Sequence, residues 1–316
     1  MIAIFYKTNN STIETSKTVD ILDSLQVKDV LWLDLYDPSG DEKRAVENFL
    51  DTTLQSRAQA EEIESSSRYS ENENSIFVNS NFLIPGPDNY NLESVSFILR
   101  EQAIVSVRQV PLRSFTDIQR RILAGRKIYP TGFHILLGIL ENRVDLDADM
   151  IELMSKEIEQ YSKRVSLGED VGDEFLLDIN QLQENTMLVR ENIVDKQRVI
   201  SSILKSEKTP DEINTKLSIL LKDISSLINH TNFSFERLEY LQNTVLGLIN
   251  LEQNKIMKIF TMVSLLLMPP TLIASIYGMN IKLPLFGDFF DIVIVGALML
   301  ITVVASIIIF RKRRLL

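Results

Sequence analysis

Residues 254–280 read NKIMKIFTMVSLLLMPPTLIASIYGMN, and the 23 residues between Lys258 and Lys282 carry no formal charge. A helix of about 20 apolar residues is long enough to cross the roughly 30 Å hydrocarbon core of a bilayer. A second apolar segment follows at 290–310. The pattern therefore predicts a two-helix membrane hairpin at the C-terminal end, with spans at 259–279 and 290–310.

The first span carries a stripe of polar, small and methionine residues. Positions spaced alternately by three and four residues fall on one face of a helix. Here those positions are Asn254, Met257, Thr261, Ser264, Met268, Thr271, Ser275 and Gly278, and Asn250 continues the spacing upstream. The other faces carry aliphatic residues such as Ile259 and Val263. The stripe alone is compatible with close packing against another helix and with the wall of a water-filled pathway.

Lysine and arginine flank the two spans unevenly. Lys255 and Lys258 precede the first span and Arg311-Lys312-Arg313-Arg314 closes the second, whereas the connecting loop contains only Lys282. Cytoplasmic flanks of membrane helices carry an excess of Lys and Arg. The N-terminal residues show no secretory signal. We therefore expect a multi-pass protein of a bacterial-type plasma membrane, with both termini in the cytosol.

The composition argues against several classes of function. The chain has no cysteine, and its two histidines, His134 and His230, have no His or Cys at ligand spacing, which disfavours a zinc site. Residues 1–257 hold 27 Lys and Arg against 41 Asp and Glu, a net charge of −14, so they lack the basic face of a nucleic-acid-binding protein. No phosphate-binding glycine loop or nucleophile elbow is present. The sequence therefore predicts neither an enzyme, nor an organic cofactor, nor a nucleic-acid partner.

Residues 1–130 are predicted to form a small α/β domain. Runs rich in β-branched and aromatic residues predict strands at Ile2–Tyr6, Val30–Leu35, Ile76–Ile84, Val95–Leu99 and Ile104–Val107. Residues 37–42 predict a turn leading into a helix, residues 57–68 a second helix, and residues 85–89 a turn between strands.

Residues 131–258 are predicted to form a helical stalk. Helices are expected at 131–166 and 173–206. A third helix is expected to start at Thr209-Pro210-Asp211-Glu212, which provides an N-cap, a proline at the first helical position and a reciprocal glutamate. Aliphatic residues occupy eight of ten heptad positions in this third helix. These positions are Leu217, Leu220, Ile224, Leu227, Thr231, Ser234, Leu238, Leu241, Val245 and Leu248. One unbroken helix from Asp211 to Tyr277 would be about 100 Å long.

The end of the first span resembles the hallmark of the CorA-type magnesium transport protein family. The resemblance rests on Tyr277-Gly278-Met279-Asn280, followed by a short loop and a second span close to the C-terminus, and it extends to 250–255 and 268–271. It implies an α+β protein with an N-terminal cytosolic domain (1–130), long stalk helices (131–258) and a transmembrane hairpin (259–316). It also implies a homopentamer that conducts Mg²⁺, with Co²⁺ and Ni²⁺ as further candidate ions, and that is regulated by intracellular Mg²⁺.

The resemblance also implies roles for individual residues. Gly278, Met279 and Asn280 would form the selectivity motif, with the Asn280 amide contacting the ion through its hydration shell. The pore-lining candidates are Asn250, Asn254, Met257, Phe260, Thr261, Ser264, Met268, Thr271 and Ser275. Among these, Met257, Phe260 and Met268 are candidates for an apolar constriction. Asp223 resembles, after a small gap in register, an acidic position in relatives and is our candidate for a regulatory metal ligand.

One departure from the family pattern concerns the loop between the spans. Many relatives follow the tripeptide with an aromatic residue and a loop containing Met-Pro-Glu, whereas this chain has Ile281-Lys282-Leu283-Pro284-Leu285. The acidic residue is therefore absent, and Asp288 is the alternative source of negative charge. Two other interpretations stay open: a zinc-transporting relative, which usually has Val in place of Met279, and a membrane-anchored coiled-coil scaffold or sensor without transport.

Overall fold

The computed structural model describes residues 1–8, 12–55, 68–86, 90–125, 127–168, 172–279 and 289–312. The chain divides into two compact units, Met1–Gln242 and Asn243–Leu316. The first unit contains a mixed sheet and several helices, and the second contains two apolar helical segments. The expected α+β class is confirmed. The expected functional division at 130 and 258 stays a prediction.

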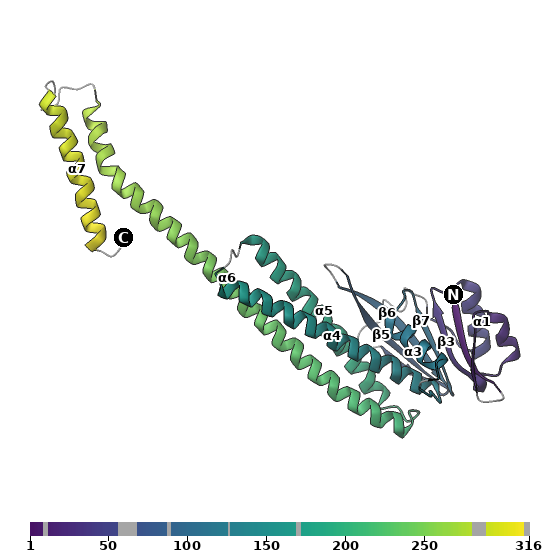
Figure 1. The fold of residues 1–316 in the computed structure, drawn as a ribbon. Helices are drawn as coiled ribbons and strands as arrows, with labels where there is room; N and C mark the ends of the chain where they lie inside the picture. Colours follow the sequence, from purple (N-terminus) through teal and green to yellow (C-terminus); the bar gives the residue numbers. More distant parts are fainter. Residues whose placement is uncertain are drawn as a thin grey trace. The chain divides into compact units, whose positions relative to one another are not determined.

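A seven-stranded sheet forms the centre of the first unit (Figure 1). Its strands are β1 (Ile2–Lys7), β2 (Ile13–Ser16), β3 (Val30–Tyr36), β4 (Tyr69–Glu71), β5 (Ser75–Pro85), β6 (Tyr90–Arg100) and β7 (Ala103–Arg108). Their order is β2-β1-β3-β7-β6-β5-β4, and β3 and β7 are parallel while the other neighbours are antiparallel. All five predicted strands are present, and the short edge strands β2 and β4 were not predicted.

Each face of the sheet is covered by a different set of residues. On one face, aliphatic side chains of β1, β3 and β7 pack with Val46 and Leu50 of α1 (Gly40–Leu50) and with Leu22 of the 3-10 helix η1 (Val19–Ser24). On the other face, Trp32 stacks on Phe5 at 5.2 Å between ring centroids and lies 6.0 Å from Phe115 of α3 (Arg113–Leu123). Because side chains alternate along a strand, both sets can come from the same strands. The sheet is therefore a middle layer with apolar cores on both sides.

A buried ion pair crosses the parallel part of the sheet. Arg108 Nη2 donates to Asp34 Oδ2 at 2.8 Å, and Gln119 Nε2 of α3 donates to the same oxygen at 2.8 Å. Ser106 donates to Asp34 Oδ1 at 2.8 Å and accepts from the Trp32 indole at 2.9 Å. A buried carboxylate needs such partners to offset its lost hydration. The pair therefore fixes α3 against β3 and β7.

Two of the shorter predicted elements can be compared with the structure. The helix expected after residues 37–42 is α1, and it begins with a capping box in which Ser39 Oγ accepts from the Glu42 amide and Glu42 Oε2 accepts from the Ser39 amide. The helix expected at 57–68 lies outside the described residues except for Arg68, which is in a bend. Helix α3 was not expected.

The predicted stalk helices are α4 (Gly132–Ser166), α5 (Asp173–Ile203) and α6 (Asp211–Tyr277). Their starts agree with the predictions within one residue, and α5 ends three residues earlier than predicted. Helix α4 begins directly against β7: a Cβ on Gly132 would lie 2.6 Å from the Ile104 amide nitrogen and 2.7 Å from the Ala103 carbonyl carbon. Only glycine permits this close approach of the helix to the strand.

The start of α6 is right, but its predicted capping box is not formed. The Thr209 hydroxyl donates to the Ile203 carbonyl at 3.0 Å. Glu212 pairs with Lys216 at 2.5 Å and lies 3.8 Å from His134 Nε2. The glutamate therefore joins the starts of α6 and α4 instead of capping its own helix.

The heptad prediction for α6 is confirmed within the first unit. Of the eight positions in this unit, seven are buried and Leu227 is half-buried, whereas in the second unit Val245 is buried and Leu248 is exposed. Polar contacts to α5 flank the buried stripe: Arg190 Nε donates to Asn232 Oδ1 at 2.7 Å, and Gln242 Nε2 donates to Asn180 Oδ1 at 2.8 Å. The stripe is thus the face that α6 packs lengthwise against its neighbours.

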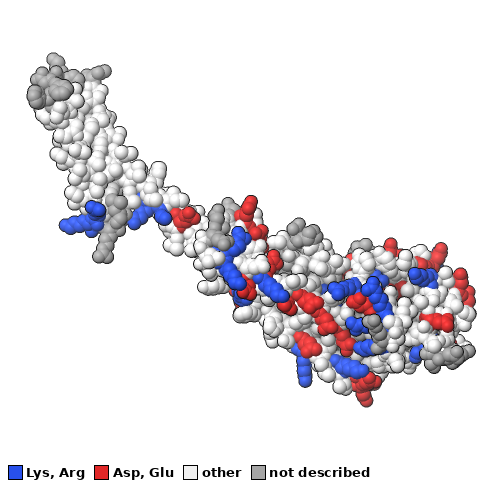
Figure 2. Space-filling model, viewed as in Figure 1, with Lys and Arg blue, Asp and Glu red and all other residues white. Residues whose placement is uncertain are grey.

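The second unit contains the C-terminal part of α6 and helix α7 (Phe289–Lys312). Both helices include an apolar segment long enough to cross a membrane. Figure 2 shows these segments without charged side chains, and blue Lys and Arg side chains gather where the apolar part of α6 begins and where α7 ends. The predicted transmembrane hairpin is thereby supported by the length and the composition of both helices.

Candidate functional site

The candidate ion pathway is the face of α6 that carries the polar and methionine stripe. Every stripe position from Asn250 to Ser275 lies on this one uninterrupted helix. Most of these side chains are exposed, Met257 by 60%, Phe260 by 68% and Met268 by 63%, and Ser264 is half-buried. Ile259 on another face is 50% exposed. A single chain therefore presents the stripe without a covering partner among the described residues, and its role as a pore wall stays a prediction.

Two stripe threonines bond to their own helix. Thr261 Oγ1 donates to the Met257 carbonyl at 2.8 Å, and Thr271 Oγ1 donates to the Leu267 carbonyl at 2.7 Å. Each hydroxyl proton is therefore occupied within the helix, while the oxygen keeps lone pairs that can accept a hydrogen bond. On the face of α6 that carries the stripe, the hydroxyl oxygens of Thr261 and Thr271 therefore act as hydrogen-bond acceptors.

Pro269 and Pro270 lie inside α6 and interrupt its hydrogen-bond ladder. A proline has no amide proton, so the carbonyls of Leu265 and Leu266, four residues earlier, lose their usual helical donors. The Thr271 hydroxyl replaces neither donor, because it donates to the Leu267 carbonyl.

The predicted selectivity motif begins with Gly278, directly after the last residue of α6. The Gly278 amide donates to the Ala274 carbonyl at 2.9 Å, and the Met279 amide donates to the Ile276 carbonyl at 3.3 Å. A Cβ on Gly278 would lie 3.1 Å from the Ala274 oxygen, closer than most side chains tolerate. Glycine thus permits the tight final turn, and Met279 is 51% exposed. Asn280, Lys282 and Asp288 lie outside the described residues.

The candidate regulatory residue Asp223 is exposed on α6, directly before the buried heptad residue Ile224. Among the described residues, no group of three or more His, Cys, Asp or Glu side chains could hold a metal ion. Asp223 is therefore not part of such a group in the described part of the chain, and its proposed role depends on a neighbouring copy. His230 is exposed, and His134 Nδ1 shares a hydrogen bond with the Thr131 hydroxyl at 2.9 Å.

Sequence reasoning missed a buried polar cluster that joins α4, α5 and β5. Asp147 Oδ1 accepts from Arg143 Nε at 2.9 Å and from Asn192 Nδ2 at 3.1 Å, and Asp147 Oδ2 lies 3.3 Å from Lys196 Nζ. Lys196 Nζ also donates to the backbone carbonyl of Asn81 at 3.0 Å. Burial lowers the pKa of Lys196 to about 8, although the nearby Asp147 carboxylate acts in the opposite direction. These contacts lock the two helices and the sheet together.

A sequence pattern for this cluster was available. Arg143 and Asp147 are four residues apart on α4, and Asn192 and Lys196 are four residues apart on α5, so each pair shares a helix face. Most of the other buried residues on these two helices are apolar. Polar pairs on buried helix faces indicate a network, but only the structure shows that the two pairs meet.

The whole chain resembles known magnesium transport proteins. A family profile described as "CorA-like Mg2+ transporter protein" matches residues 27–312. The magnesium transport protein CorA of Campylobacter jejuni is 34% identical over 99% of both chains, and that of Wolinella succinogenes is 36% identical over 90% of this chain and 91% of its own. The complete structure of the CorA magnesium transporter from Methanocaldococcus jannaschii superposes with a TM-score of 0.80 at 20% identity and covers 99% of this chain and 98% of its own. The chain belongs to the CorA family of Mg²⁺ transporter proteins.

Proposed function

We propose that several copies of this chain form a homo-oligomeric channel that conducts Mg²⁺ across the plasma membrane. The observation that carries this proposal is the unbroken helix α6, which brings the polar stripe into the Gly278-Met279 turn directly before Asn280. One stripe cannot enclose a pathway, so copies must surround an axis. A pentamer, as the family resemblance implies, is the assembly we expect.

The chemistry of the stripe suits a hydrated cation. Water molecules around Mg²⁺ point their protons outward, and Mg²⁺ gives up these waters reluctantly. A pathway for the hydrated ion should therefore offer hydrogen-bond acceptors. The hydroxyl oxygens of Thr261 and Thr271 meet this requirement because their own protons are held by backbone carbonyls.

Asn280 is proposed to form the ring at the outer mouth of the pore. An amide oxygen accepts hydrogen bonds from the first hydration shell, and five such oxygens would surround a hydrated ion without requiring its dehydration. Co²⁺ and Ni²⁺ also form hydrated divalent ions, and we propose them as further substrates. Met257, Phe260 and Met268 are proposed as the apolar constriction, because a narrow apolar segment of a pore blocks ions by dewetting.

Regulation by intracellular Mg²⁺ is the third part of the proposal. Residues 1–257 carry a net charge of −14, and an oligomer places some of these carboxylates close together. A divalent ion bound between copies would relieve this repulsion and favour one arrangement of the α6 helices, which we take to be the closed state. Exposed Asp223 on α6 is our candidate ligand. The proposed orientation puts both termini in the cytosol.

Cysteine accessibility tests the pore wall. The chain lacks cysteine, so Thr261, Ser264, Thr271 and Ser275 can each be replaced singly by Cys without background labelling. In membrane vesicles, we expect a water-soluble, membrane-impermeant thiol reagent to modify these four variants. The matched controls Ile259→Cys, Val263→Cys and Ile273→Cys should stay unmodified because they face lipid or helices. Equal protection of both sets would favour simple helix packing and would contradict the pore assignment.

A further inference from the structure

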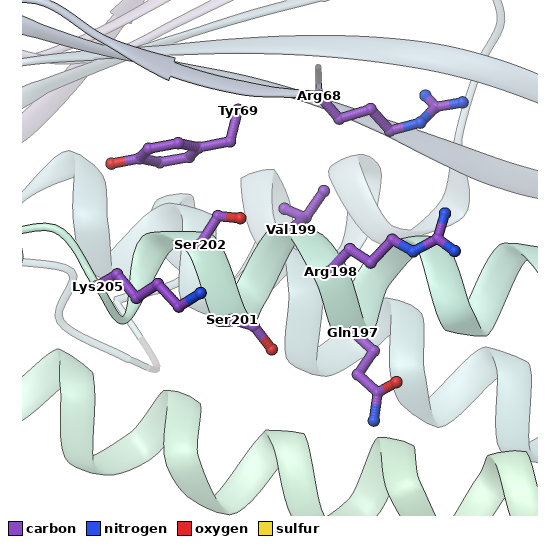
Figure 3. A pocket seen from close by; sticks show the side chains of 8 residues that line it. All are labelled: Arg68, Tyr69, Gln197, Arg198, Val199, Ser201, Ser202 and Lys205. Carbon is purple, nitrogen blue, oxygen red and sulfur yellow. The ribbon is translucent and has the colours of Figure 1, made fainter. Parts of the chain in front are cut away.

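A cationic cleft lies in the first unit, between the edge of the sheet and α5 (Figure 3). Its volume is about 320 Å³. The lining residues are Arg68, Tyr69, Gln197, Arg198, Val199, Ser201, Ser202 and Lys205. A neighbouring cleft of about 340 Å³ shares Arg68 and Arg198 with it. Volumes of this size are typical of small-molecule sites.

The charged residues lining this cleft are all positive. Arg68, Arg198 and Lys205 line it, and no carboxylate does among the residues that the structure describes. This is unusual for a chain with a net charge of −10. Arg198, Ser202 and Lys205 are spaced by four and three residues, which places them on one side of α5 and the turn that follows it. Figure 3 shows the Arg68 and Arg198 side chains extending in the same direction.

Arg68 is held in place by the protein. Its Nε lies 2.5 Å from Asp195 Oδ1, and its Nη1 donates to Asn81 Oδ1 at 3.1 Å. The Asn81 amide in turn donates to Asp195 Oδ2 at 3.1 Å. With its side chain only 13% exposed, Arg68 is a preorganised cation, and its Nη2 forms no hydrogen bond with the described residues.

The other two cations, Arg198 and Lys205, are held less tightly than Arg68, although Arg198 interacts electrostatically with Asp195. Neither Arg198 nor Lys205 makes a hydrogen bond or an ion pair with the described residues, and both are exposed. The neighbouring carboxylates are already engaged: Asp195 with Arg68, and Glu71 with the Tyr69 and Ser206 hydroxyls, at 2.9 and 2.7 Å. The cleft therefore keeps two exposed cations, Arg198 and Lys205, that form no ion pair with the described residues.

We propose that this cleft binds the phosphate groups of a soluble small molecule. Three cationic groups around one cleft match an anion with several negative charges better than a single carboxylate. Arginine guanidinium groups donate in pairs to phosphate oxygens, and the Ser202 hydroxyl offers a further donor. The proposal concerns binding alone and does not depend on the ion pathway.

Calorimetric titration of the full-length protein tests this assignment. Sodium pyrophosphate is titrated into the protein in an uncharged detergent without Mg²⁺, against sodium chloride of equal ionic strength. The wild type should bind pyrophosphate at one site per chain. The double variant Arg198→Gln/Lys205→Gln should bind at least about tenfold more weakly, because two charge-assisted contacts are lost.

Lys222→Gln is the matched control, since Lys222 is an exposed lysine of α6 that does not line the cleft. It should bind like the wild type. Fluorescence-detected unfolding of all three proteins should show similar stability, because the replaced side chains are exposed and form no hydrogen bond or ion pair with the described residues. Absence of pyrophosphate binding beyond that of sodium chloride would overturn the proposal, and so would equal binding by the wild type and the double variant.

Discussion

Lys196 provides a quantitative test of how the first unit is held together. Its side chain is fully buried, and its Nζ lies 2.5 Å from Asn192 Oδ1 and 3.3 Å from Asp147 Oδ2. The Phe82 ring centroid lies 5.6 Å from the same nitrogen. Burial lowers the pKa of Lys196 from 10.5 to about 8 in the folded protein, whereas the unfolded chain keeps the ordinary value.

This difference makes the free energy of unfolding depend on pH. Between pH 8 and 10.5 the unfolded chain binds more protons at Lys196 than the folded protein does, so the contribution of this residue to stability increases as pH rises. It is smallest below pH 8 and would be complete above pH 10.5. From the two pKa values, the contribution of Lys196 to the free energy of unfolding rises by about 2 kcal/mol between pH 7 and pH 9.5.

Thermal unfolding of wild type and Lys196→Met at pH 7 and pH 9.5 measures this gain. The chain's one tryptophan, Trp32, is fully buried in the first unit and reports its unfolding by fluorescence. Groups that titrate in both proteins cancel in the comparison. From pH 7 to pH 9.5, the free energy of unfolding of the wild type relative to the variant should rise by about 2 kcal/mol, or roughly 4–8 °C in Tm. Exposed Lys222→Met is the control and should show no such change. A difference between wild type and Lys196→Met that is independent of pH would refute the reasoning.

Two further predictions concern the start of α4 and regulation by Mg²⁺. Gly132→Ala should destabilise the first unit by about 2 kcal/mol or more, because its Cβ would clash with the β7 backbone. Gly40→Ala is the control, because a Cβ on Gly40 would meet no atom within 4 Å, and it should change the free energy of unfolding by less than about 0.5 kcal/mol in the same fluorescence assay. Equal destabilisation by both substitutions would contradict the close approach of α4 to β7. Millimolar Mg²⁺ should protect the first unit of the oligomer from limited proteolysis more than NaCl of equal ionic strength does, and Asp223→Ala should lose this protection. An equal response to both salts would contradict metal bridging.

The sequence predicted the long elements well because their patterns repeat. Helix α6 combines a heptad pattern with an apolar span, and no strong breaker precedes its prolines. Strands β3 and β7 are predominantly apolar runs buried on both faces. Strands β2 (IETS) and β4 (YSE) are short and polar, so their pairing at the sheet edges has no comparable pattern.

Helix α3 and the buried cluster were harder to predict for different reasons. The buried residues Phe115, Ile118 and Ile122 of α3 have helical spacing, but the 11-residue segment is otherwise polar. The contact between Asp147 and Lys196 joins residues 49 positions apart, which helix periodicity cannot reveal. For the pore, the stripe was evident in the sequence, but the partner surface belongs to other copies of the chain.

The central claim is that α6 and the residue that follows its Gly278-Met279 turn form a Mg²⁺ pathway. The most direct test measures Mg²⁺ entry into proteoliposomes that contain a trapped fluorescent Mg²⁺ indicator, for the wild type and for Asn280→Leu. The wild type should admit Mg²⁺ along an inward gradient. Asn280→Leu should remain an intact oligomer by size-exclusion chromatography and should conduct little or no Mg²⁺. Undiminished Mg²⁺ entry through Asn280→Leu, or Zn²⁺ entry without Mg²⁺ entry in the wild type, would contradict the account.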